Sequence, residues 1–141
     1  MLKKTLYFIF PIILTYLFTI LQGHWAMWDY RTAMSSSCLD CDLFSDLVMF
    51  SFFPSITLSL VYLFFIWVQP RNGIRIAVSF WILFLWWLLI NTDIFVDRVA
   101  AWSTFTNVWQ IGLGLTMFPG ISLGLLYCIL YRFIYAKSHN L

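Results

Sequence analysis

Two cysteines, Cys38 and Cys41, stand three positions apart and have the clearest chemical potential in the sequence. In an oxidising compartment, cysteines at this spacing can form a disulfide, relay electrons or bind a metal ion. A thiol relay needs a thiolate stabilised by a nearby cation or a helix N-terminus, but Asp40 and Asp42 place negative charge beside the sulfurs. We therefore favour an inert disulfide or free thiols, with redox and metal-binding roles as the alternatives.

A metal site at this position would recruit further soft or borderline ligands. Thiolate and thioether donors of this kind suit copper(I). Apart from the cysteine pair, no two of the available donors stand at a recognised metal-site spacing, so we expect no metal and no other cofactor. The residues that such a site would use are His24, Met27, Met34, Cys38 and Cys41.

Asp93 and Asp97 are four positions apart, a spacing that places both carboxylates on one face of a helix. Paired carboxylates could serve an intramembrane aspartyl protease, and this stretch is similar to the lipoprotein signal peptidases. Those enzymes take their two aspartates from different segments, whereas residues 106–109 carry no acid. We therefore predict no catalytic residue and lean against an enzyme. Asp93, Asp97 and Arg98 remain candidate polar residues of the outer face, with Asp97 and Arg98 as an ion pair and Asn91 as a helix cap.

The composition decides what kind of protein must position these residues. The chain has 141 residues, of which 62% are hydrophobic and 10% charged, whereas soluble domains carry about 25% charged residues. So few charges cannot cover a globular surface, which excludes a soluble enzyme, a nucleic-acid-binding domain and a disordered regulator. An integral membrane protein remains.

Four apolar runs each approach the roughly 20 residues that a helix needs to cross the hydrocarbon core. Because backbone amides in lipid must be paired within their own segment, these runs should be helical. We expect an all-α integral membrane protein, a four-transmembrane-helix bundle forming a single domain over residues 1–141. Its spans are expected at about residues 5–21, 47–68, 74–94 and 108–131, with an outer loop at about 22–46.

The charge distribution predicts the orientation of these spans. Six of the eight lysines and arginines fall on one side of the four-span arrangement, and Arg31 and Arg98 fall on the other. The positive-inside rule then predicts a multi-pass protein of a bacterial cytoplasmic (inner) membrane with both termini in the cytoplasm. All six acidic residues are aspartates, and all of them lie on the outer side.

The position of the cysteine pair resembles the quinone-linked disulfide-generating family typified by DsbB. That family has four spans, a cytoplasmic N-terminus and a Cys-x-x-Cys motif before span two, so the resemblance implies a periplasmic thiol-redox function for Cys38 and Cys41. It covers about the first half of the chain. The family has a second cysteine pair between spans three and four, but residues 91–107 contain no cysteine. Cys128 is expected near the cytoplasmic end of span four, so a thiol relay would be incomplete.

Small residues recur at every fourth position in two of the spans, a spacing that lets helix backbones approach closely in lipid. We predict that spans two and four pack along these rows, and a homodimer through span four is the competing interpretation. Pro11, Pro54 and Pro119 can each kink their spans. The rows are Ser51, Ser55 and Ser59 in span two, and Gly112, Thr116, Gly120, Gly124 and Cys128 in span four.

Three classes of function remain. Coupled transport needs an ionisable group within the membrane, and only Asp93 comes near it, at the edge of its span. We therefore favour a small membrane interaction protein, either an accessory subunit or an immunity-type protein against a pore-forming toxin, acting by helix–helix recognition. The alternatives are a thiol-redox or metal-handling protein that uses Cys38 and Cys41, and a small channel or transporter. The expected partners are the lipid bilayer and another membrane protein or a second copy, with no nucleic acid.

Overall fold

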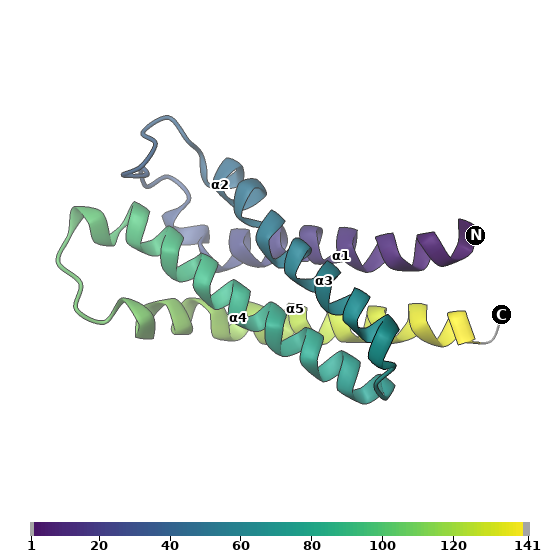
Figure 1. Cartoon of the computed structure of the whole chain (residues 1–141). Coiled ribbons are helices and arrows are strands. Elements are labelled where there is room, and N and C mark those ends of the chain that lie inside the picture. The colour runs from purple at the N-terminus through teal and green to yellow at the C-terminus, as the bar shows by residue number, and fades with distance from the viewer. Residues whose placement is uncertain (1, 140–141) are drawn as a thin grey trace.

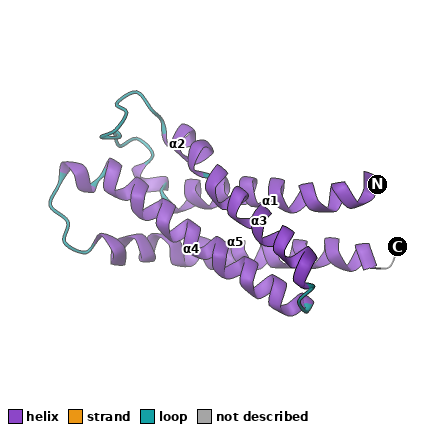
Figure 2. Ribbon diagram, in the orientation of Figure 1, coloured by secondary structure: helices purple, strands orange, loops and turns teal. Residues whose placement is uncertain are grey.

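The computed structural model describes residues 2–139, with side chains for residues 9–133, and this part of the chain is all-helical (Figure 2). Its long helices are α1 (Leu2–Ala26), α3 (Phe52–Val68), α4 (Asn72–Arg98) and α5 (Val108–His139). A short α2 (Leu43–Phe50) precedes α3, and two 3-10 turns, η1 (Trp28–Tyr30) and η2 (Ala100–Trp102), follow α1 and α4. Within the described residues, four helical segments are long and apolar enough to cross a membrane, which confirms the predicted four-helix membrane fold.

The helices run back and forth along one axis (Figure 1). Both ends of the chain lie at one end of the bundle, together with the turn between α3 and α4. The opposite end carries residues 27–42 and 99–107, which we call the capped end. Helices α1 and α4 therefore run in the same direction, toward the capped end.

The second span is built from two helices, α2 and α3, that meet at Ser51. Pro54 explains the break, because it has no amide hydrogen and its ring clashes with the carbonyl of the residue four positions earlier. At the end of α2, the Ser51 hydroxyl and amide both donate to the carbonyl oxygen of Leu47, at 2.6 and 2.9 Å. In contrast, Pro11 and Pro119 lie inside the continuous helices α1 and α5.

The small-residue row of α5 lies against α4, so the prediction that it packs on span two is wrong. A Cβ atom added at Gly112 would meet Thr92 of α4, and one added at Gly124 would meet the ring of Phe80 of α4 at 2.6 Å. Gly120 similarly faces Phe84 of α4. The glycines therefore allow close approach, as expected for such a row, but the helix that uses the space is α4.

The serine row of span two does not bond to α5. Ser55 and Ser59 donate back to carbonyl oxygens of their own helix at 2.8 and 2.6 Å, and α3 packs mainly on α1. Side chains of α3 and α5 instead meet through tyrosines, where the hydroxyls of Tyr62 and Tyr127 are 2.5 Å apart. Long side chains bridge these two helices because their backbones stay apart.

Polar side chains tie α1 to its neighbours inside the bundle. The indole nitrogen of Trp87 in α4 donates to the Thr19 hydroxyl at 3.1 Å, and the Thr15 hydroxyl lies 3.2 Å from the Tyr127 hydroxyl of α5. Trp87 and Thr19 are both buried. Such interhelical bonds are favoured in lipid because an unpaired polar group there has no water to bond to.

One helical turn closer to the capped end, Gln22 of α1 and Asn91 of α4 are fully buried. Asn91 donates to the Thr116 hydroxyl of α5 at 2.9 Å, so it links two helices and does not cap one, contrary to the prediction. The side-chain oxygen and nitrogen of Gln22 have no hydrogen-bond partner among the described residues. Because α1 and α4 are parallel and Thr19 bonds to Trp87, Gln22 and Asn91 lie at about the same depth.

Replacing Gln22 with leucine is expected to stabilise the bundle, because leucine has a similar volume and removes a buried amide without partners. An unsatisfied buried group costs about 1–3 kcal/mol, so a gain of that order is expected in thermal unfolding in detergent. Asn91→Leu is the matched control, and it should destabilise the protein because it breaks the bond to Thr116. A loss of stability in the Gln22 variant would contradict this assignment and indicate a partner for the amide.

Candidate functional site

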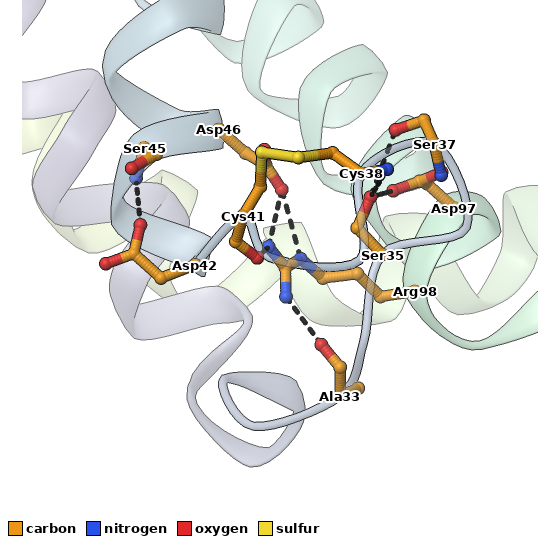
Figure 3. Close-up of a disulfide and its surroundings, with 10 residues drawn as sticks. All are labelled: Ala33, Ser35, Ser37, Cys38, Cys41, Asp42, Ser45, Asp46, Asp97 and Arg98. Carbon is orange, nitrogen blue, oxygen red and sulfur yellow. Dashed lines mark hydrogen bonds and ion pairs between the residues drawn. A yellow bond between two sulfur atoms is a disulfide. The ribbon is translucent and has the colours of Figure 1, made fainter.

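The C-terminal end of α4 organises the capped end through Arg98, whose side chain is 1% exposed. Its Nη2 and Nε atoms donate to a carboxylate oxygen of Asp46 in α2 at 2.6 and 3.1 Å (Figure 3). The guanidinium also donates to the backbone oxygens of Ala33 at 2.5 Å and Cys41 at 3.1 Å. One buried arginine thus joins α4, α2 and two points of the loop between α1 and α2.

The neighbouring Asp97 holds a turn of three consecutive serines. Its carboxylate accepts from the Ser37 amide at 3.0 Å and from the Ser35 hydroxyl (Figure 3). It also accepts from the Ser36 hydroxyl at 2.7 Å. In the backbone, the Ser36 amide donates to the Asp97 carbonyl oxygen at 3.1 Å. The expected ion pair between Asp97 and Arg98 is therefore wrong, because adjacent helical residues point in different directions and each finds its own part of the loop.

Cys38 and Cys41 form a disulfide within a tight turn at this site. The Cys41 amide donates to the Cys38 carbonyl oxygen at 3.1 Å, and the Cys38 amide donates to the Ser35 hydroxyl at 3.1 Å. The first interaction closes the turn, and the second attaches it to the serines held by Asp97. Figure 3 shows the disulfide beside the pair of Arg98 and Asp46. The disulfide is therefore integrated into the Arg98-centred network.

The site ends where α2 begins, at Asp42. Its carboxylate accepts from the Ser45 amide at 2.8 Å, which caps the helix. Hydrogen bonding from Ser45 lowers the pKa of Asp42 below its ordinary value of 3.8.

This lowered pKa predicts a pH dependence for the start of α2. A carboxyl group whose pKa is lower in the folded than in the unfolded state stabilises the fold. This stabilisation is complete at a pH above the unfolded-state pKa, and it is lost as the pH falls through the folded-state pKa. The Ser45 amide resonance is therefore expected to titrate below pH 3.8 in NMR spectra. The variant Asp42→Asn, which keeps a capping oxygen but no titrating group, should show no such step. An identical titration in both proteins would contradict the assignment.

The residues considered as metal ligands have different surroundings, and the sulfurs of Cys38 and Cys41 are joined in the disulfide. Met27 is fully buried, whereas Met34 is 62% exposed. His24 lies edge-on to Trp28, with ring centroids 5.3 Å apart. In the part of the chain that the structure describes, no group of three histidine, cysteine or acidic residues could hold a metal ion. Cys128 lies in α5 as a free cysteine.

The two aspartates of α4 do not act as a pair. Asp97 is used by the serine turn, whereas Asp93 is exposed and lines a groove outside the network. The sequence did not identify Asp46 or the serines as members of the site. The sequence did contain one signal for Asp46, which was Arg98. A buried cation needs an anionic partner, and all six aspartates lie on the same side of the four-span arrangement as Arg98.

These features define a multi-pass α-helical membrane protein with a disulfide-containing cap fixed to the end of α4. No family model, curated protein or solved structure matches the chain.

Proposed function

We propose that this protein is a small polytopic membrane interaction protein, either an accessory subunit or an immunity-type protein against a pore-forming toxin. Recognition would use the helix faces in the bilayer and the capped end. The observation that carries this proposal is the Arg98 network, which holds the loop in one conformation through bonds to Asp46, Ala33 and Cys41. A preorganised loop loses less conformational freedom when it binds a partner.

Large apolar side chains on the capped end support this role. Met34 is 62% exposed and Leu39, within the disulfide turn, is 64% exposed. Trp102 is 57% exposed, and its indole nitrogen donates to the Met34 carbonyl oxygen at 3.0 Å. Exposed apolar side chains on a rigid frame are typical of surfaces that bind other proteins or the membrane interface.

The proposed orientation places the capped end outside a bacterial inner membrane and both termini in the cytoplasm. It is supported by the six lysines and arginines that the four-span arrangement assigns to the termini side. A reporter that is fluorescent only in the cytoplasm, fused to the C-terminus, should be bright. A dark fusion at normal expression would contradict this orientation.

Site-specific photo-crosslinking in native membranes tests the proposed recognition. A photoreactive residue in place of Leu39 should give one discrete protein adduct. A photoreactive residue in place of Leu60, an exposed residue of α3, reports contacts on the helix face. Adducts at Leu39 that disappear in an Arg98→Met background would support recognition by the ordered cap. Protein adducts at neither position, with the protein intact, would reject the proposal.

The disulfide favours one second candidate, a thiol-redox function. This candidate is tested by replacing Cys38 and Cys41 with serine. Under the interaction proposal we expect adduct formation at Leu39 to persist and stability to fall by about 2 kcal/mol, the chain-entropy contribution of so short a loop. Loss of a thiol-dependent activity in cells with normal expression and normal adducts would favour the redox function instead.

A further inference from the structure

A groove with a volume of about 390 Å³ opens between the second span (α2 and α3), α4 and α5 on the side of the bundle, near the capped end. Its walls are almost entirely apolar or aromatic. They include Phe50 and Phe53 from the second span, Trp86 from α4 and Trp109 from α5. Small-molecule sites are typically clefts of about 300–1,000 Å³ with apolar walls and a few placed polar groups.

The one ionisable residue in the walls is Asp93. Among the described residues, no side chain forms an ion pair or a hydrogen bond with its carboxylate. The neighbouring acids Asp97 and Asp46 are both engaged, by the serine turn and by Arg98. Ionisable residues of membrane spans commonly mark binding sites, and Asp93 lies toward the end of its span.

The groove has a polar end and an apolar end along α4. Asp93 lies seven residues beyond Trp86, which corresponds to two helical turns and a rise of about 10 Å. At the deeper end, the ring of Trp86 stacks on Phe53 with centroids 6.0 Å apart and an interplanar angle of 14°. The charge therefore lies toward the capped end, and the aromatic surface lies deeper in the span.

We propose that this groove binds an organic ammonium cation that carries a hydrocarbon chain. The ammonium group pairs with Asp93, and the chain extends along Trp86 and Phe53. The negative charge of Asp93 attracts a cation, and the apolar and aromatic walls of the groove match a hydrocarbon chain. This site is separate from the capped end and does not depend on the proposed function.

The test uses the whole protein labelled with 5-fluorotryptophan in a neutral sugar detergent. Dodecyltrimethylammonium is titrated while fluorine NMR follows each tryptophan, with Trp86 and Trp109 assigned by substitution to phenylalanine. We expect saturable shifts at these two residues and little change at Trp81, which is not part of the groove wall. An uncharged dodecyl amphiphile should give no saturable response.

Asp93→Asn keeps the shape of the side chain and removes its charge, so it should weaken binding at least tenfold. Asp29→Asn is the matched control, because Asp29 is also exposed but lies in η1, and this variant should bind as the wild type does. Equal affinity of the Asp93 variant and the wild type would overturn the proposal. So would equal saturable binding of the uncharged amphiphile, which would leave the groove as a general apolar surface.

Discussion

Replacing Arg98 with methionine is expected to destabilise the protein by about 3–5 kcal/mol, the usual cost of removing one partner from a buried ion pair. Methionine keeps much of the side-chain volume but leaves the Asp46 carboxylate, which is 19% exposed, without its cation. It also leaves the carbonyl oxygens of Ala33 and Cys41 without their donor. Thermal unfolding in detergent measures the loss, and hydrogen exchange should show residues 33–46 losing protection first.

Arg31 provides the matched control for this variant. It donates to the Trp28 carbonyl oxygen at 2.8 Å and lies over the Trp28 ring at 4.2 Å, but it is exposed. Because exposed charge interactions contribute little, Arg31→Met should change stability by less than about 1 kcal/mol. The double variant Arg98→Met with Asp46→Leu should recover part of the loss, since no buried charge is left unpaired. Equal effects of the two arginine variants would contradict the central role of Arg98.

Gly112→Ala is expected to destabilise the packing of α5 on α4 by about 1–3 kcal/mol, the range typical of overpacking. The added Cβ would clash with the Thr92 hydroxyl oxygen and lie 3.2 Å from the Thr92 Cα, so backbone as well as side chain must move. The Thr92 hydroxyl also donates to the Leu88 carbonyl oxygen at 2.7 Å, which restricts its escape. Thermal unfolding and cross-linking between α4 and α5 should both report the change.

Gly114 in the same helix is a close control for this experiment. A Cβ added there meets nothing within 4 Å. Gly114→Ala should therefore be neutral or stabilising by up to about 1 kcal/mol, because alanine favours the helix more than glycine does. If both substitutions have the same effect, the close approach of α4 and α5 at Gly112 is wrong.

The membrane class and the four spans follow from properties that each segment carries by itself. An apolar run of about 20 residues must be helical in lipid, whatever surrounds it. The ends of the helices were less predictable: α4 continues to Arg98, beyond the expected end near residue 94. Its last turn remains helical because Asp97 and Arg98 bond to a loop that is distant in sequence.

The small-residue row of α5 illustrates a different limit. Its spacing correctly indicated close helix packing, because glycine leaves space beside a backbone wherever it occurs. It could not indicate whether α3, α4 or a second copy fills that space, since all three present suitable apolar surfaces. The turn between α3 and α4 and the break at Ser51 set the paths of these helices, and α4 lies against the row.

The sequence by itself determined the class of protein, the number of spans and the cysteine pair, because these depend on composition and local spacing. Only the tertiary structure decided the partners of the charged residues. Arg98 pairs with Asp46, 52 positions away, and not with the adjacent Asp97. The physical reason is that a buried charge is stabilised by whichever opposite charge and carbonyl oxygens the folded chain brings within hydrogen-bonding distance.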